Sequence, residues 1–304
     1  MPGQVALITG ANRGLGSETA RQLAARGYHV VLTARNPADG ESAVARIQAA
    51  VPGARAQSLP LDVASFASIR GFVEAFRALG LPLHVLVNNA GVITTAARPS
   101  FTVEGFELTL GTNHVGPALL THLLLPDLAR AAPSRIVIVS SAMHRQGVGP
   151  GPGPDFDYDN LKGEKSFHPV TAYRNSRLAN LWFASELARR LRGKMEVAVL
   201  ALSPGWVPET QAAAAPSAVQ RFLFRYVLPH MPFARTVKEG SDTIVYVATE
   251  PGLQAQSGGF FEDRKPGVMS AEAHDEMKAR RLWDETMRWC GIAGEYGAVG
   301  AAAA

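Results

Sequence analysis

Val5-Ala6-Leu7-Ile8-Thr9-Gly10-Ala11-Asn12-Arg13-Gly14-Leu15-Gly16 is the stretch that decides the fold. It begins as a short apolar run, passes through a glycine-rich turn, and leads into 17–24, where apolar residues have helical spacing. Strand, glycine turn and helix in this order suit a dinucleotide pyrophosphate, because glycines let backbone amides approach phosphate and the helix N-terminus adds partial positive charge. The turn therefore predicts a dinucleotide site, formed by Gly10, Asn12, Arg13, Gly14, Leu15 and Gly16.

The residue after the second apolar run indicates which dinucleotide is bound. This run, 28–34, ends at Arg35, roughly 20 residues after the glycine turn. An acidic side chain there would bind the ribose hydroxyls of NAD, whereas an arginine can pair with the 2′-phosphate of NADP, and Arg13 adds a second cation. The sequence thus favours NADP(H). Asp39 and Glu41 keep NAD(H) as the less favoured alternative, and both arginines could instead only solvate the rim.

Helices and apolar strands continue to alternate along the chain, which predicts right-handed βαβ units and a Rossmann-type, doubly wound parallel sheet. The expected helices are 40–51, 65–79, 102–131 with an internal bend at 111–117, 170–191, 236–249 and 274–289. The expected strands are 55–61, 83–88, 135–141, 196–202 and 257–261. We therefore expect a single α/β domain over 1–290, followed by a flexible C-terminal tail over 291–304.

Tyr173 and Arg177 stand four residues apart in the helix expected over 170–191 and would share one of its faces. A cation about 5 Å from a phenol favours the phenolate form. Taken alone, the pair is more typical of an ordinary surface helix. Ser141, which follows a buried strand and would stand at the same sheet edge as the glycine turn, makes a catalytic interpretation the better one.

Composition excludes several other classes of function. The formal charge is +4 and no Lys/Arg block resembles a nucleic-acid arm, so we expect no nucleic-acid partner. A single cysteine, Cys290, excludes an internal disulfide and a cysteine metal cluster, and the acidic run at 155–159 lacks the ending of a calcium loop, so no metal site is predicted. Without a signal peptide or an apolar stretch of about 18 residues, we expect no membrane-spanning segment and a cytoplasmic location.

Several motifs together resemble the classical short-chain dehydrogenases/reductases, close to their retinol-dehydrogenase-like branch. The resemblance runs from Thr9 to about Trp289. It is carried by the loop Thr9–Gly16, Asn88-Asn89-Ala90-Gly91, Asn113-His114-Val115-Gly116, Ser140-Ser141, Ser203-Pro204-Gly205, Glu239-Gly240, Ser257-Gly258-Gly259-Phe260-Phe261 and Arg281-Leu282-Trp283.

This resemblance implies roles for particular residues. Tyr173 would exchange a proton with the substrate oxygen, Ser141 would hydrogen-bond that oxygen, and Asn113 would hold a water of the proton relay. The cofactor would contact the glycine loop and a set of residues at the strand ends and on the helix expected over 170–191. These are Arg35, Asp62, Val63, Asn89, Ala90, Gly91, Tyr173, Arg177, Pro204, Gly205 and Thr210.

Arg177 departs from the family pattern, which has a lysine four residues after the tyrosine. In the family that lysine binds the nicotinamide ribose, favours the phenolate and passes protons through water. Arginine can do the first two but does not readily release a proton. Carbonyl reduction needs a neutral tyrosine and depends less on this tuning than alcohol oxidation does. We expect an oxidoreductase that favours reduction; the alternative is a catalytically weak or inactive dinucleotide-binding scaffold or sensor.

Two segments are expected to border the substrate. The Gly/Pro-rich stretch 147–154 predicts a loop beside the cleft. The apolar segment 211–235 could equally be a core helix or a mobile lid, and its aromatic residues could also rest on a membrane surface. As a lid it predicts a small lipophilic carbonyl or alcohol substrate such as a retinoid, a steroid or an aromatic ketone or aldehyde. A homodimer stays open as the assembly.

Overall fold

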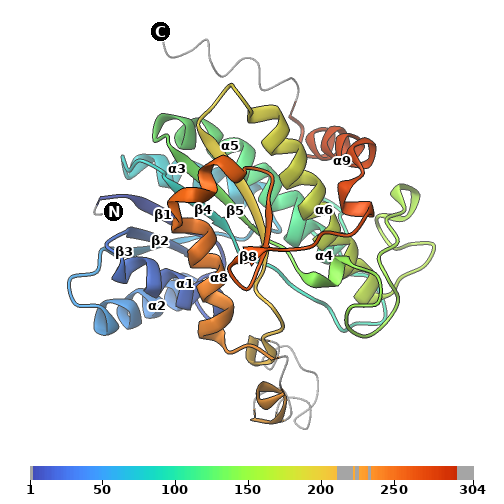
Figure 1. Ribbon diagram of the computed structural model, residues 1–304, viewed down its shortest axis with the longest axis horizontal. Coiled ribbons are helices and arrows are strands. Elements are labelled where there is room, and N and C mark those ends of the chain that lie inside the picture. The colour runs from blue at the N-terminus through green and yellow to red at the C-terminus, as the bar shows by residue number, and fades with distance from the viewer. Residues whose placement is uncertain (1–2, 211–221, 223–225, 232–233, 293–304) are drawn as a thin grey trace.

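In the computed structural model, residues 3–210, 222, 226–231 and 234–292 are described. They contain an eight-stranded sheet in the order β3-β2-β1-β4-β5-β6-β7-β8. Strands β1 to β7 pair in parallel, and β8 pairs antiparallel with β7. Helices cover both faces, with α1, α2 and α8 together on one side (Figure 1). The prediction of one Rossmann-type, doubly wound α/β domain is confirmed.

The elements lie within a few residues of their predicted positions, with two exceptions given below. The strands are β1 Val5–Ile8, β2 His29–Ala34, β3 Ala56–Pro60, β4 Val85–Asn88, β5 Ser134–Val139, β6 Val197–Ser203, β7 Phe260–Glu262 and β8 Lys265–Pro266. The helices are α1 Gly14–Ala25, α2 Pro37–Ala50, α3 Phe66–Ala78, α4 Leu108–Leu110, α5 Gly116–Arg130, α6 Pro169–Leu191, α8 Val237–Thr249 and α9 Glu276–Trp289.

The central strands are apolar on both faces because each face packs against helices. In β1, Val5 and Leu7 belong to the apolar core that the sheet forms with α3, α5 and α6. Ala6 and Ile8 point the other way, into the core formed with α1, α2 and α8. This arrangement brings the carboxyl ends of β1, β2, β4, β5 and β6 to one edge, where the predicted site residues follow the strands.

The prediction of a helix over 102–131 is wrong at its start, and the observed helix is irregular at its centre. Residues 101–107 form a turn closed by a bridge between Phe101 and Glu107, and the Glu107 carboxylate accepts the N–H groups of the first helical residues. The expected bend at 111–117 takes the form of a π-helical turn, Gly111–Val115. It lies where Gly116 approaches the loop after β3 so closely that a Cβ would stand 1.8 Å from the Val63 carbonyl oxygen.

The predicted strand 257–261 is also displaced. It begins at Phe260, because 251–256 forms a 3-10 helix, and it continues into a short hairpin with β8. Most of the segment 211–235, for which a lid and a core helix are both open, lies outside the described residues, and so does most of the predicted tail 291–304. Among the residues that are described, every helix is too short or too polar to cross a membrane.

The last helix, α9, packs against α6 and adds apolar side chains to the core. Trp283 stacks on Phe183 with 5.4 Å between ring centroids, and Cys290 is buried. His114, which follows Asn113 in the π-helical turn, places its Nε2 atom 2.9 Å from the Thr286 hydroxyl. A histidine is thus enclosed between α6, α9 and the π-helical turn without a charged partner among the described hydrogen bonds.

This enclosed histidine leads to a prediction on acid stability. Burial lowers the pKa of His114 from 6.5 to about 4, and burial also lowers the pKa values of His122 and His144. The unfolded chain therefore binds a proton near pH 6.5 while the folded chain does not. We expect the free energy of unfolding to fall as the pH drops from 6.5 to 4, by about 3 kcal/mol from His114.

Denaturant unfolding at a series of pH values tests this. His114→Gln should make the decrease between pH 6.5 and 4 shallower, whereas His168→Gln, at an exposed position, should leave it unchanged. An equal decrease in the wild type and in His114→Gln would show that His114 is not a source of the acid sensitivity.

Candidate active site

The glycine turn forms an open cradle at the end of β1. Gly10 and Gly14 have φ values of +62° and +57°, which side chains other than glycine rarely adopt. At Gly16 a Cβ would lie 2.5 Å from Asn89 Nδ2, and Asn89 donates from this nitrogen to the Thr9 carbonyl at 2.8 Å. The side chain of Arg13, the residue before α1, makes no capping hydrogen bond. The amides of the first turn of α1 and the close-packed glycines therefore suit an anionic pyrophosphate.

Residues after β6 lie against the same cradle. A Cβ at Gly14 would stand 3.3 Å from the Thr210 methyl group, and the Thr210 hydroxyl donates to the Val207 carbonyl at 2.7 Å. Pro204 and Gly205 form the turn that leaves β6, where Gly205 has a φ of +78°. The structure therefore brings the predicted cofactor residues of β1 and β6 together, although they are far apart in the sequence.

Three arginines belong to the segments next to the glycine turn. Arg13 precedes α1 and Arg35 follows β2, and both are exposed. Arg46, on α2, donates to the Asn12 carbonyl in the glycine turn at 2.7 Å and to the Ser42 hydroxyl at 2.9 Å. The sequence analysis missed Arg46. Its spacing from Ser42 marks a helical face, but only the packing of α2 shows that this face meets the glycine turn.

Asp62 and Val63, which follow β3, line the next part of the edge. Asp62 accepts the Ala64 N–H through Oδ1 at 3.0 Å, so its carboxylate is held beside the strand end. Val63 is buried, and its carbonyl faces Gly116 at the start of α5. An adenine contact from these residues stays a prediction.

Tyr173 and Arg177 contact each other on α6, as their spacing predicts. The guanidinium carbon of Arg177 lies 4.9 Å from the centroid of the Tyr173 ring. Arg177 is 6% exposed, and its Nη1 donates to the Val139 carbonyl at the end of β5 at 2.9 Å. A Cβ on Gly91 would lie 2.6 Å from Arg177 Nη2. The cation is therefore wedged between the tyrosine ring and the loop that follows β4.

One hydrogen-bond donor of Arg177 is unpaired within the described part of the chain. Its buried Nε has no hydrogen-bond partner among the described residues. A buried donor without a partner costs free energy unless a ligand or water accepts its proton. The position beside Gly91 and Tyr173 suits the ribose of a nicotinamide nucleotide.

Ser141 caps a short 3-10 helix, Ala142–His144, which packs against α6. Its hydroxyl accepts the Met143 N–H at 3.2 Å, and its carbonyl oxygen lies 2.7 Å from His144 Nδ1. Because the Ser270 N–H donates to His144 Nε2 at 3.2 Å, Nδ1 must carry the proton of the neutral ring. His144 thus anchors the backbone of Ser141, a function that the sequence analysis missed.

Asn113 links the π-helical turn to the loop after β4 and to α6. Its Oδ1 accepts the Val92 N–H at 2.7 Å, and its Nδ2 donates to the Val92 carbonyl and to the Ser176 hydroxyl, each at 2.9 Å. Ser176 in turn donates to the Tyr173 carbonyl at 2.7 Å. Asn113 therefore holds the Gly91 region against the helix that carries Tyr173. Its place in a water relay stays a prediction.

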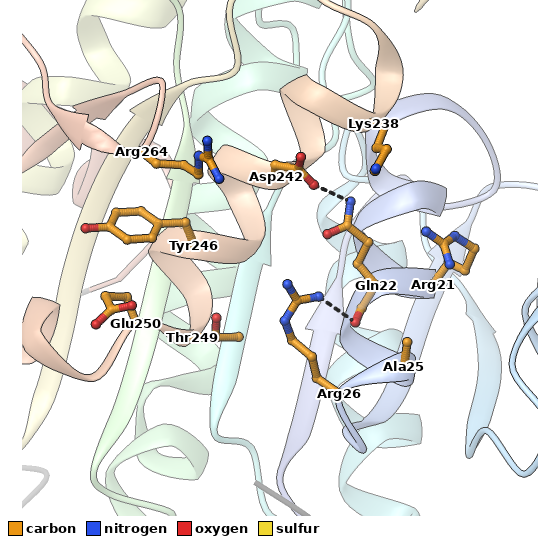
Figure 2. A pocket seen from close by; sticks show the side chains of 10 residues that line it. All are labelled: Arg21, Gln22, Ala25, Arg26, Lys238, Asp242, Tyr246, Thr249, Glu250 and Arg264. Carbon is orange, nitrogen blue, oxygen red and sulfur yellow. Dashed lines mark hydrogen bonds between the residues drawn. The ribbon is translucent and has the colours of Figure 1, made fainter.

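A separate hollow of about 580 Å³ lies between α1 and α8 (Figure 2). Gln22 donates to Asp242 across it at 2.8 Å, and Arg26 donates to the Gln22 carbonyl at 3.0 Å. None of the predicted site residues lines this hollow. It is therefore distinct from the candidate active site at the carboxyl edge of the sheet.

Comparisons with known proteins identify sequences similar to this chain. A family model described as short chain dehydrogenase matches residues 4–152, and one described as AcuH dehydrogenase domain matches 208–299. Retinol dehydrogenase 11 from Mus musculus is 40% identical over 292 residues, covering 96% of this chain and 88% of the relative.

Two solved structures share the fold. An uncharacterised protein from Mycobacterium paratuberculosis superposes with a TM-score of 0.73 and 29% identity, over 96% of this chain and 94% of the other. A metagenomic short-chain oxidoreductase in complex with NADP has a TM-score of 0.59 and 25% identity, over 82% of this chain and 92% of the other.

Proposed function

Because this chain belongs to the short-chain dehydrogenase/reductase family, as an oxidoreductase of the retinol-dehydrogenase-like branch, we propose that it uses NADPH to reduce the carbonyl group of a lipophilic substrate. The observation that carries the proposal is the contact of Arg177 with the Tyr173 ring at 4.9 Å. A phenol beside a fixed cation, at the sheet edge that also holds the glycine cradle, supports a role for Tyr173 as the proton donor.

The chemistry balances with the residues present. NADPH, when bound at the glycine cradle, would be the source of the hydride for the carbonyl carbon. Tyr173 gives its phenolic proton to the carbonyl oxygen, which becomes the alcohol, while the Ser141 hydroxyl donates a hydrogen bond to that oxygen. Arg177 stabilises the phenolate left on Tyr173 until solvent returns a proton. Because arginine does not readily release its own proton, this arrangement favours the direction in which the tyrosine begins neutral.

The three arginines support NADP(H) rather than NAD(H). Arg13 lies in the glycine turn, Arg35 directly follows β2, and Arg46 adds a third positive charge through its contact with Asn12. An arginine can pair bidentately with a phosphate, whereas no carboxylate occupies the position after β2 that would bind the ribose hydroxyls of NAD. The NADP complex of the metagenomic relative is in line with this choice.

The lipophilic substrate is supported by the segment after β6. Phe222, Tyr226, Val227 and Met231 are exposed apolar or aromatic side chains in this segment. The name of the Mus musculus relative points to retinol, an apolar alcohol whose oxidised form is an aldehyde.

A panel of substrates tests the proposed function. With NADPH, the purified chain should have a higher kcat/KM for retinoid, steroid or aromatic carbonyls than for small polar ketones, by about tenfold or more, as expected from burying additional methylene groups. Equal kcat/KM on both kinds of carbonyl would contradict the substrate class. Oxidation of alcohols with no reduction of any carbonyl would contradict the proposed direction.

Arg177→Lys tests what the arginine changes. A lysine can pass protons through water, so we expect alcohol oxidation at pH 7 to rise by about tenfold while carbonyl reduction changes by less than about threefold. Arg177→Met should impair both directions because it removes the cation beside Tyr173. If lysine instead raises reduction from no activity to a normal rate, the wild type is an inactive dinucleotide-binding protein.

A further inference from the structure

Arg174, the neighbour of Tyr173, is a buried cation without a carboxylate partner among the described residues. It is 0% exposed, and the ion pairs of the described residues do not include it. A buried charge is costly unless hydrogen bonds satisfy it. The hydrogen-bond partners of Arg174 therefore indicate what this buried charge does beside Tyr173.

The partners of Arg174 are backbone carbonyls of the loop that follows Ser141. Its Nη1 donates to two carbonyls and its Nη2 to three, at distances from 2.6 to 3.2 Å. The acceptors belong to Met143, Arg145, Val148, Gly149 and Pro150. Nη2 has two N–H groups for three carbonyls, so at least one proton is shared. The guanidinium is thus the centre around which the loop folds.

The composition of the loop explains how so many carbonyls converge. Gly147, Gly149 and Gly151 have φ values of +76°, +73° and +84°. These left-handed conformations turn successive peptide groups inward, which residues with a Cβ would resist. The Gly/Pro-rich sequence, predicted only as a loop beside the cleft, is therefore matched to the arginine on α6.

Asn175 fastens the other end of the same loop. Its Oδ1 accepts the Asp155 N–H at 2.8 Å and its Nδ2 donates to the Asp155 carbonyl at 2.7 Å. Beyond this point the chain is held by apolar packing, since Phe156 meets Trp182 edge to face with 5.3 Å between centroids. Two consecutive side chains of α6 therefore hold residues 143–155, in addition to the ion pair of Arg145 with Glu262 near the start of the loop.

The place of the loop in the chain gives this clamp a function. Ser141 precedes the loop, and Tyr173 directly precedes Arg174 on α6. We propose that Arg174 and Asn175 are positioning residues, which hold 143–155 on α6 in advance as the substrate-side wall beside Tyr173. This inference rests on the proposed carbonyl reduction. It assigns substrate affinity to two residues whose described contacts are with the loop and not with the cofactor cradle.

The experiment compares Arg174→Met, Arg174→Lys and Asn175→Ala with the wild type. Arg192→Met is the matched control, because it removes an exposed arginine at the opposite end of α6. Amide hydrogen exchange is measured without substrate, NADPH affinity by fluorescence titration, and kcat and KM with one lipophilic aldehyde.

In Arg174→Met we expect exchange over 146–155 to rise about tenfold and KM to rise about tenfold, with kcat within about threefold and NADPH affinity unchanged. Arg174→Lys should show a smaller effect in the same direction, because one ammonium cannot reach all the carbonyls that the planar fork reaches. Asn175→Ala should raise exchange near Asp155 and raise KM by about threefold. Arg192→Met should behave as the wild type.

Two results would overturn the inference. One is unchanged exchange over 146–155 in Arg174→Met and Asn175→Ala. The other is a joint loss of kcat and NADPH affinity, which would show general damage to the site. If Arg174→Met does not fold, the exchange and KM values of Arg174→Lys and Asn175→Ala test the inference in its place. If the wild type reduces no carbonyl, the proposed function fails, and the exchange data still decide whether the two side chains order the loop.

Discussion

Tyr173→Phe is expected to lower kcat for carbonyl reduction about a thousandfold while leaving NADPH affinity within about threefold, because a positioned general acid contributes about 10²–10⁴ to the rate. The substitution removes the hydroxyl and keeps the ring, so the packing of Arg177 at 4.9 Å should persist. Steady-state kinetics with a lipophilic aldehyde and fluorescence titration of NADPH give the two values.

Tyr158→Phe is the matched control for this result. The Tyr158 ring also faces an arginine, with the guanidinium carbon of Arg281 3.9 Å from its centroid, but it lies in the loop packed against α6 and α9. Its loss of a hydroxyl should leave kcat within about threefold. A Tyr173→Phe variant that kept more than a tenth of the wild-type kcat would show that another group protonates the substrate.

Arg35→Asp should reverse the cofactor preference. The substitution places a carboxylate where a 2′-phosphate would lie, so kcat/KM for NADPH should fall by about a hundredfold, the effect of losing a charge-assisted pair and adding a repulsion. The kcat/KM for NADH should stay the same or rise, because a carboxylate can accept hydrogen bonds from the ribose hydroxyls. Initial rates with both cofactors measure the ratio.

Arg55→Asp controls for the change in net charge, since Arg55 is exposed just before the amino end of β3, away from the carboxyl edge of the sheet. It should leave the ratio of NADPH to NADH unchanged. If Arg35→Asp and Arg55→Asp affect NADPH equally, the preference comes from general charge rather than from a phosphate contact.

Much of the fold follows from features that act locally. Strand β1 is apolar at every position because helices cover both faces, and such a run followed by a glycine turn and a helix admits few alternatives. The contact between Tyr173 and Arg177 follows from helical spacing alone. These predictions needed no knowledge of which segments meet in space.

What the sequence analysis missed depends on distant segments. The π-helical turn around Asn113 forms where Gly116 meets the Val63 carbonyl, a contact that no local pattern encodes. From the sequence alone, Arg46 is interpreted as a solvent-exposed charge on a helix. Its hydrogen bond to the Asn12 carbonyl is found only when α2 packs beside the glycine turn. From the sequence alone, Arg174 is also interpreted as a solvent-exposed charge. Its partners are backbone carbonyls, which no sequence motif marks.

The helix start predicted at 102 shows a different limit. Apolar spacing continues through 101–107, but the Glu107 carboxylate and Gly105, with a φ of +82°, favour a turn and a cap before the helix begins. A glutamate that accepts two backbone N–H groups acts as a cap, although Ser, Thr, Asp and Asn are the usual residues there. Glu107 and Gly105 can both be recognised in the sequence, but the apolar periodicity of 101–107 favours a helix start at residue 102.

In the proposed reaction, a hydride passes from NADPH to a carbonyl carbon, and Tyr173 protonates the carbonyl oxygen. The most direct test incubates the purified chain with NADPH deuterated at the transferring carbon and a lipophilic aldehyde, then measures deuterium in the alcohol by mass spectrometry. We predict one deuterium per alcohol from NADPH, a rate at least about tenfold lower from NADH, and almost no product with Tyr173→Phe. Alcohol without deuterium, equal rates from both cofactors, or full product with Tyr173→Phe would contradict it.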